Sequence, residues 1–397
     1  MGNLNNVPRL RFPEFEGEWE IMPLIHFSEN GFSNGAFNDP KKVGSGYRII
    51  NVKDMYIDGT INIENLTRVA LDENEFQKNR VEYGDLFFTR SSLVKEGIAY
   101  SNVNLNRVDD LTYDGHLIRM RPNQKITSPT FLYYCFSTST ARTQFIQRGK
   151  TTTMTTIGQE DIASVEISFP TLPEQSKIAN FLTAVDDKLS QLKKKKSLLK
   201  EYKKGVMQKI FSQELRFKDE NGEEFPKWEE KKLGEIGKFS AGGDLDKLDY
   251  QKEQNGKYIY PIFANGAGAG LYGFASTFQY KSNCVTVSGR GNLGYANART
   301  QSFNAIVRLI VIEPKNYINS KFLEEAINNT NFAIESTGVP QLTVPQISTY
   351  KISIPCLPEQ TKIANFLSAI DDKISQCSVQ IEKMEGWKKG LLQRMFV

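Results

Sequence analysis

The sequence predicts an α+β protein in which two similar domains are joined by a long coiled coil formed by two repeated helices. Three observations lead to this prediction: a long internal repeat, a 3.5-residue apolar period inside it, and the same order of strand-like and helix-like stretches in both segments between the repeats. The 397 residues correspond to two or three domains at about 150 residues each.

The repeat defines the domain organisation. Residues 171–191 (TLPEQSKIANFLTAVDDKLSQ) return 185 residues later at 356–376 (CLPEQTKIANFLSAIDDKISQ), with 16 of 21 positions identical. A weaker echo, LRF followed by a tryptophan, occurs near Trp19 and again near Trp228. We therefore expect four segments: a domain at 1–170, a helical region at 171–212, a second domain at 213–355 and a second helical region at 356–397.

The helical regions carry the apolar pattern of a coiled coil. Steps of four and three residues alternate over more than four heptads, which predicts a left-handed coiled coil. An amphipathic helix on a globular surface would follow a 3.6-residue period instead. The chain between the copies is long enough for either relative orientation. The predicted pairing positions are Ile178, Leu182, Val185, Leu189, Leu192 and Leu199 in the first copy, and Ile363, Leu367, Ile370, Ile374, Ile381 and Leu391 in the second.

Charged residues interrupt or flank this apolar seam. Lys203 and Lys388 occupy equivalent seam positions, where a charge costs stability but can fix the register. The carboxylate pairs 186–187 and 371–372 lie next to seam residues. We interpret them as a solvated helix face or as partners in interchain salt bridges, not as an acid–base pair. A helix over 174–211 would be roughly 57 Å long.

The segments outside the helical regions have strand-like stretches first and a helix-like stretch late. In the first segment these are YRIINV (47–52), GDLFFTRSS (84–92) and HLIRMRP (116–122), then the helix-like FLYYCFSTSTARTQFIQ (131–147). In the second they are YIYPIFA (258–264), SNCVTVSG (282–289) and NAIVRLIVI (304–312), then SKFLEEAINN (320–329). The shared order predicts one fold with diverged surfaces.

Polar and basic loop residues between these stretches suggest contact with DNA. Arginine can bind guanine through two hydrogen bonds, asparagine and glutamine can do the same with adenine, and small polar groups can hold phosphates. Loops are polar in most proteins, so only the matched sets favour DNA. The candidates are Ser33, Asn34, Lys41, Lys42, Arg90, Ser91, Ser92, Lys95, Arg148, Lys150 and Thr153, then Asn265, Ser288, Arg290, Asn292, Asn297, Arg299, Thr337 and Gln341.

Composition limits the remaining classes of function. The net charge is only +4, so a basic footprint must be local. The four cysteines and two histidines lack metal-ligand spacing, which argues against a zinc site. We expect free thiols, no membrane span and a cytoplasmic location, since no long apolar run or signal-peptide layout occurs. Catalytic motifs of a methyltransferase or hydrolase are also missing.

Four segments, LRFPEFEGEW (10–19), ISFPTLPEQSKIANFL (167–182), FPKWEEKKLGEI (225–236) and ISIPCLPEQTKIANFL (352–367), resemble the specificity subunit of type I restriction–modification enzymes. The resemblance covers essentially the whole chain. It implies two target-recognition domains that each read half of a split double-stranded DNA site. It also implies helical regions that pair antiparallel, set the spacing and dock two modification (methyltransferase) subunits. Restriction (endonuclease–translocase) subunits would then join the complex.

The same resemblance implies a non-catalytic chain that binds no cofactor. S-adenosylmethionine, ATP and Mg²⁺ would be used by the partner subunits. Two alternatives stay open: a free-standing tandem DNA-binding regulator or scaffold, and a stand-alone methyltransferase or nuclease. The missing catalytic motifs argue against the second alternative.

Overall fold

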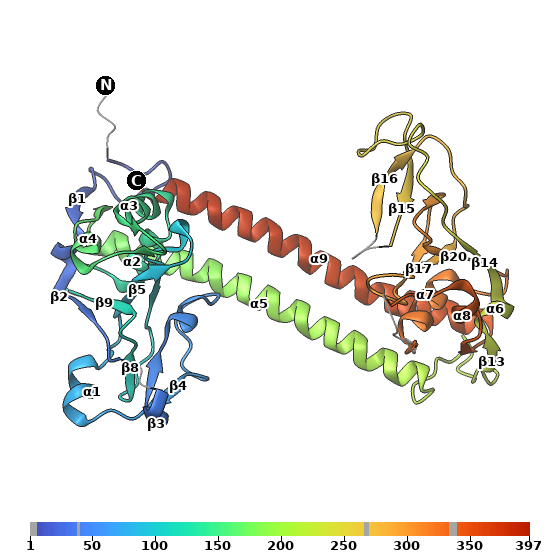
Figure 1. The fold of residues 1–397 in the computed structure, drawn as a ribbon, viewed down its shortest axis with the longest axis horizontal. Coiled ribbons are helices and arrows are strands. Elements are labelled where there is room, and N and C mark those ends of the chain that lie inside the picture. Colours follow the sequence, from blue (N-terminus) through green and yellow to red (C-terminus); the bar gives the residue numbers. More distant parts are fainter. Residues whose placement is uncertain (1–5, 38–39, 266–269, 333–339) are drawn as a thin grey trace. The chain divides into compact units, whose positions relative to one another are not determined.

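The computed structural model describes residues 6–37, 40–265, 270–332 and 340–397. The chain divides into two compact units (Figure 1). Unit 1 consists of Met1–Lys193 and Val379–Val397, and unit 2 of Lys194–Ser378. Each unit combines one β-rich domain with part of both long helices. The α+β architecture expected from the sequence is confirmed.

The two long helices are α5 (Leu172–Phe211) and α9 (Leu357–Met395). Each begins with Leu-Pro-Glu-Gln, where proline loses no helical hydrogen bond and glutamate favours the positive end of the helix dipole. In unit 1 the first half of α5 packs against the second half of α9, and in unit 2 the second half of α5 packs against the first half of α9. The pairing is therefore antiparallel, which the apolar pattern alone left open.

The predicted seam positions line the inner faces of these helices. Ile178, Leu182, Val185, Leu192, Ile363, Leu367, Ile370 and Leu391 are buried, and Leu189, Leu199, Ile374 and Ile381 are partly buried. The neighbouring positions toward solvent are mostly exposed. The 3.5-residue period thus corresponds to one continuous face on each helix.

The β-rich domain of unit 1 is built on two sheets. A four-stranded sheet has the order β2 (Ser28–Asn34), β9 (Leu117–Pro122), β5 (Leu86–Thr89), β7 (Ser101–Val103). A three-stranded sheet has the order β4 (Thr67–Val69), β3 (Val43–Ile50), β8 (Leu111–Tyr113), with β3 and β8 parallel. A small third sheet has the order β10 (Lys150–Thr151), β11 (Thr155–Thr156), β6 (Ser91–Ser92).

Short helices and one strand pair complete unit 1. The helices are α1 (Glu73–Asn79), α2 (Pro129–Phe136), α3 (Ser139–Arg148) and α4 (Gln159–Ala163). The 3-10 turns are η1 (Leu24–Phe27), η2 (Pro40–Lys42), η3 (Val52–Met55) and η4 (Lys95–Gly97). Strands β1 (Glu20–Pro23) and β12 (Glu166–Phe169) pair antiparallel just before α5.

Unit 2 repeats this topology. Its four-stranded sheet has the order β14 (Gly237–Ala241), β20 (Ile310–Pro314), β17 (Cys284–Val287), β18 (Ala296–Arg299). Its three-stranded sheet has the order β16 (Leu271–Ala275), β15 (Tyr260–Phe263), β19 (Asn304–Ala305), again with one parallel pair. The remaining elements are β13 (Glu229–Lys232), α6 (Leu233–Ile236), α7 (Ser320–Asn328), α8 (Val344–Ser348) and β21 (Lys351–Ile354). The expectation of one shared fold is confirmed.

Two expected elements are interrupted. The helix expected over 131–147 is two helices, because the Thr138 side chain accepts a hydrogen bond from the Ala141 amide and starts α3 anew. The strand expected over 304–312 is split into β19 and β20. Val307 and Arg308 between them have φ of 54° and 55°, a left-handed conformation that cannot continue a strand.

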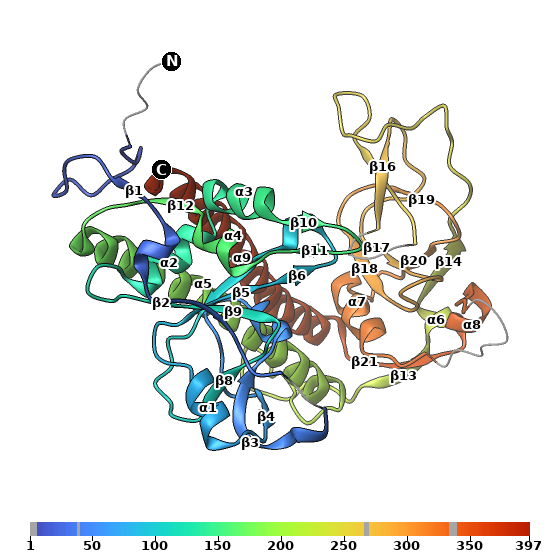
Figure 2. The ribbon, with the colours of Figure 1, turned by 60° about the vertical axis from the view of Figure 1, so that its left-hand side comes forward.

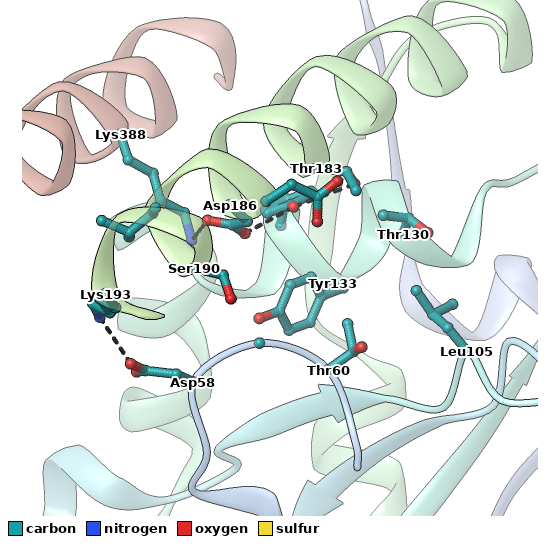
Figure 3. Close-up of a pocket in the computed structure, with 14 residues that line it drawn as sticks. Asp58, Thr60, Leu105, Thr130, Tyr133, Thr183, Asp186, Ser190, Lys193 and Lys388 are labelled. Atoms are coloured by element: carbon teal, nitrogen blue, oxygen red, sulfur yellow. Dashed lines mark hydrogen bonds and ion pairs between the residues drawn. The ribbon is translucent and has the colours of Figure 1, made fainter. Parts of the chain in front are cut away.

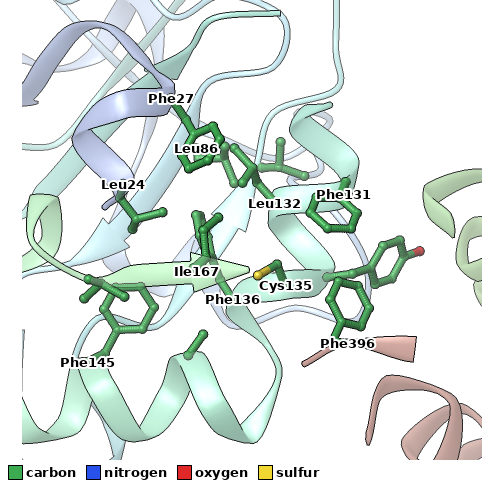
Figure 4. Packing of buried hydrophobic residues seen from close by; sticks show 14 of the residues in the cluster. Leu24, Phe27, Leu86, Phe131, Leu132, Cys135, Phe136, Phe145, Ile167 and Phe396 are labelled. Carbon is green, nitrogen blue, oxygen red and sulfur yellow. The ribbon is translucent and has the colours of Figure 1, made fainter. Parts of the chain in front are cut away.

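The core of unit 1 includes the end of the chain (Figure 4). Phe131 of α2 packs against Trp19 and Phe396, with ring centroids 6.0 Å and 5.3 Å away. In unit 2 the cluster that contains Phe322 of α7 also contains Ile210 of α5. Each β-rich domain is thus packed onto the helix pair of its own unit. Within the described ranges, no helix has both the length and the apolar character required to cross a membrane.

Candidate nucleic-acid interface

A buried ion pair joins each β-rich domain to a long helix. In unit 1 the Glu174 carboxylate accepts two hydrogen bonds of 2.8 Å from Arg11, while the Trp19 indole donates to it at 3.4 Å. In unit 2 Glu359 accepts from Arg216 at 2.7 and 3.2 Å, and the Trp228 indole donates to it at 3.1 Å. A buried carboxylate requires such partners. The LRF, tryptophan and LPEQ echoes in the sequence are the parts of this joint.

The glutamine that follows completes each joint. The Gln175 side-chain oxygen accepts from the Ser128 amide at 2.9 Å, and its amide donates to the Pro170 carbonyl at 2.9 Å. Gln360 makes the same pair of bonds, with the Asn319 amide at 2.8 Å and the Pro355 carbonyl at 2.9 Å. Ser128 and Asn319 are the N-caps of α2 and α7. The LPEQ sequence therefore sets the angle between each domain helix and its long helix.

The seam lysines lie in a second pair of equivalent contacts. Lys203 binds Asp371 at 2.8 Å and Glu325 of α7 at 2.7 Å. Lys388 binds Asp186 at 2.6 Å (Figure 3). Burial alone would lower the pKa of Lys203, but its hydrogen bonds to Asp371 and Glu325 outweigh burial and raise it. Asp186 and Asp371 are thus salt-bridge partners within one chain, not between chains, while Asp187 and Asp372 face solvent.

A cavity of about 400 Å³ lies beside the Lys388–Asp186 contact in unit 1 (Figure 3). Lys193 closes it on one side through a 2.8 Å ion pair with Asp58. Burial raises the pKa of Tyr133, which lines the cavity, to about 12. The described residues contain no group of three or more histidine, cysteine or acidic side chains that could hold a metal ion.

In unit 1 the structure brings two sets of predicted DNA contacts together. Ser91 and Ser92 form β6, which pairs with β11, and β11 pairs with β10, which begins at Lys150 (Figure 2). Arg90, Lys95 and Lys150 are exposed around this small sheet, and Thr153 lies at the turn between β10 and β11. We call residues 90–97 and 150–156 the β6 surface.

In unit 2 the corresponding loop holds other candidates. It connects β17 and β18, which take the places of β5 and β7, and it carries Ser288, Arg290 and Asn292. The Asn265 side chain accepts from the Gly289 amide at 2.8 Å, and Arg290 donates to Gln341 at 3.3 Å. Arg290 and Asn292 are exposed, whereas Ser288 is buried. Thr337, another candidate of this unit, lies outside the described residues.

Two candidates at the edge of the unit 1 sheet take part in internal hydrogen bonds. The Ser33 hydroxyl bonds to the Tyr113 hydroxyl at 2.8 Å. The Asn34 side-chain oxygen accepts from Gln159 at 2.6 Å. These bonds stabilise β2 against the rest of the domain, and they leave less capacity for contact with a base.

Two arginines are also used within the fold. Arg148 donates to the Ser164 hydroxyl at 2.9 Å. Arg299 is buried, donates to Thr286 at 2.9 Å and lies 3.5 Å from the centre of the Phe263 ring. Burial lowers the pKa of Arg299 to about 10. Among the other candidates, Lys41 and Lys42 are exposed and Asn297 is partly buried.

The sequence analysis missed an apolar part of the β6 surface. Leu93 and Val94 are among the exposed large hydrophobic residues, within a loop whose other side chains are the basic Arg90 and Lys95, two serines and the acidic Glu96. The signal was present as two adjacent aliphatic residues between Ser92 and Lys95, but an isolated pair has no periodicity that would mark it.

Comparison with known proteins agrees with this architecture. The family model for the type I restriction modification DNA specificity domain matches residues 18–201 and 226–383. A putative type I specificity subunit of Mycoplasma pneumoniae is 34% identical over 54% of this chain and 57% of its own length. The chain thus spans little more than half of that relative.

Two further proteins match along nearly the full chain. A putative type I restriction enzyme specificity subunit of Methanocaldococcus jannaschii is 25% identical over 98% of this chain and 95% of its own length. The crystal structure of a type I restriction-modification S subunit from M. genitalium covers 98% of this chain and 99% of its own, with a TM-score of 0.66 and 18% identity. The chain therefore belongs to the family of type I restriction–modification specificity subunits.

Proposed function

We propose that this protein supplies the DNA sequence specificity of a type I restriction–modification complex, with each β-rich domain reading one half of a bipartite site. One observation carries the proposal: the same domain fold occurs twice, held by the same joint, but with different loops. The equivalent loops read RSSLVKEG at 90–97 and SGRGNLG at 288–294. A common frame with divergent loops suits recognition of two different half-sites.

The exposed loop chemistry fits the two kinds of DNA contact. Arg90, Lys95 and Lys150 are exposed cations, and such side chains bind phosphates without reading sequence. Arg290 and Asn292 can form the paired hydrogen bonds that distinguish guanine and adenine in the major groove. Binding should therefore combine a salt-dependent part with a sequence-dependent part.

The paired helices act in this proposal as spacer and as docking surface. A 40-residue helix is about 60 Å long, and successive major-groove faces on one side of DNA recur about every 34 Å. Tyr202 and Trp387 are exposed aromatic residues at equivalent positions of the two helices. We assign them to contact with two modification subunits, because an exposed aromatic residue on a helix suits a partner interface. S-adenosylmethionine, ATP and Mg²⁺ would then be used by the modification and restriction subunits.

The test is to purify the chain with its modification subunits and to map the methylated sites by sequencing. A bipartite target with an unread gap is expected, and a continuous target would contradict the proposal. Exchange of residues 25–165 for the corresponding segment of another specificity subunit should change one half-site only. Specific binding by the chain alone, with no methyltransferase recovered alongside it, would favour a free-standing regulator.

The spacer role has a separate test. One extra heptad in each long helix lengthens the pair by about 10.5 Å, or about 3 base pairs at 3.4 Å each. The gap in the methylated site should widen by that amount. An unchanged gap in an active complex would contradict the spacer role while leaving the reading of two half-sites intact.

A further inference from the structure

We infer that Leu93, supported by Val94 and Met154, is an apolar wedge that enters the base stack of the half-site read by unit 1. The inference rests on the proposed function and adds a mode of recognition to it, namely local unstacking of the DNA. It concerns one loop, residues 90–97, and the β10–β11 hairpin beside it.

Three exposed apolar side chains lie just beyond the end of the small sheet. Leu93 is 86% exposed, Val94 60% and Met154 40%. Ser92 pairs with Thr155 at the end of the sheet, and Leu93 and Met154 are the next residues of the two chain segments beyond that pair. Single exposed aliphatic residues are ordinary, but adjacent ones at the tip of a loop mark an interaction site.

Hydrogen bonds brace the backbone of the loop that carries Leu93. Arg142 of α3 lies behind it and donates to the carbonyls of Glu96, Ile98 and Ala99 at 2.9, 2.6 and 2.7 Å. The Ser92 hydroxyl accepts from the Val94 amide at 3.3 Å on the near side. These bonds hold the backbone beside Leu93, and a loop held in this way loses less conformational entropy on binding.

The surroundings of the patch select DNA as its occupant. Arg90 and Lys95 are exposed on either side of Leu93 in the sequence. Lys150 lies two strands away on β10, where it pairs with Asp161 at 3.3 Å and keeps its side chain 76% exposed. Cations around an apolar tip match a base stack flanked by phosphates. Apolar side chains of DNA-bending proteins enter between base pairs in this way, and part of the gain comes from the extra contacts that the deformed DNA allows.

Only one of the two half-sites should be affected. The equivalent loop of unit 2 contains Leu293, which is partly buried against the core cluster of that unit. The exposed residues in that loop are Arg290, Gly291, Asn292 and, next to β18, Tyr295, and none of them is a large aliphatic side chain. The wedge is therefore a property of the domain in unit 1.

The experiment scans the bipartite site with 2-aminopurine, a base whose fluorescence rises when it is unstacked. The chain is bound to each labelled duplex as its complex with the modification subunits. We expect one base step in the half-site read by unit 1 at which 2-aminopurine fluorescence rises when the wild-type complex binds. Leu93→Ala should reduce that rise by more than half. Loss of a buried leucine side chain should also weaken specific binding about tenfold.

Two further variants serve as controls. Leu93→Met keeps a long apolar side chain and should restore the signal, and Ile21→Ala removes an exposed aliphatic residue from β1 and should change nothing. If the complex binds its site specifically but Leu93→Ala changes the fluorescence at no labelled position, the wedge is overturned and the proposed function stands. A complex that shows no preference for any sequence would instead overturn the proposed function.

Discussion

Replacement of Glu359 by alanine tests whether the buried joint holds the second domain onto its helix. The carboxylate is fully buried and accepts three hydrogen bonds, two from Arg216 and one from the Trp228 indole. Glu359→Ala would leave the indole without a partner and the guanidinium without its counter-charge. The surface pair Lys351–Glu230 of the same unit, with side chains 56% and 60% exposed, offers a matched comparison.

The two ion pairs should differ clearly in their contribution to the free energy of unfolding. Removing one partner of a buried pair typically costs about 3–5 kcal/mol. The Arg216 side chain is 22% exposed and still donates to the carbonyls of Phe225 and Pro226. We therefore expect the lower end, about 3 kcal/mol. Glu230→Ala should cost at most about 1 kcal/mol, as is usual for exposed pairs.

Hydrogen exchange measured by mass spectrometry can follow each unit separately. Glu359→Ala should speed exchange in peptides from α7 by roughly a hundredfold, which corresponds to about 3 kcal/mol. Glu174→Ala should have the matching effect on peptides from α2 and little effect on α7, because it breaks the equivalent joint of unit 1. Equal and small effects of Glu359→Ala and Glu230→Ala would refute the reasoning that the joint is energetically dominant.

Three further predictions concern the seam, the thiols and the docking surface. The raised pKa of Lys203 means that its ion pairs stabilise fully below the unfolded value of about 10.4 and are lost as the pH rises through the folded value. Lys203→Met should therefore remove part of the stability loss between pH 10 and 12 in denaturant titrations. At pH 8 a thiol reagent should modify Cys356 alone in the folded chain and all four cysteines after unfolding. Burial raises the pKa of Cys135 to about 12, and Cys284 and Cys377 are also buried. Mass spectrometry would contradict this if it detected labelling of a buried thiol in the folded chain. Tyr202→Ala with Trp387→Ala should weaken binding of modification subunits in calorimetry without changing exchange in α2 or α7, and unchanged affinity would exclude these residues from the interface.

Local patterns predicted the elements whose stabilising contacts repeat along the chain. The steps of four and three residues from Ile178 to Leu199 predict a buried face, and the structure has that face. The repeated LPEQ sequence marked the start of both long helices for the same reason. Such patterns are readable because each turn of a helix meets the same environment as the turn before it.

Single contacts between distant residues could not be predicted. Arg299 was a candidate for base recognition by residue type alone, yet it is buried between Thr286 and Phe263. The expected strand over 304–312 is interrupted at Val307 and Arg308, which adopt a left-handed backbone conformation. Valine and arginine rarely adopt this conformation, so the residue types did not predict it. In both cases the outcome depends on neighbours far along the chain.

The sequence by itself determined the duplication, the paired helices, the two α+β domains and the polar character of their loops. Tertiary structure decided the joints made by Glu174 and Glu359 and the exposure of Leu93 on a loop braced by Arg142. The physical reason is the range of the interactions. Helical periodicity and turn chemistry act over a few residues, whereas burial of a charge or exposure of a leucine follows from partners that only folding brings within reach.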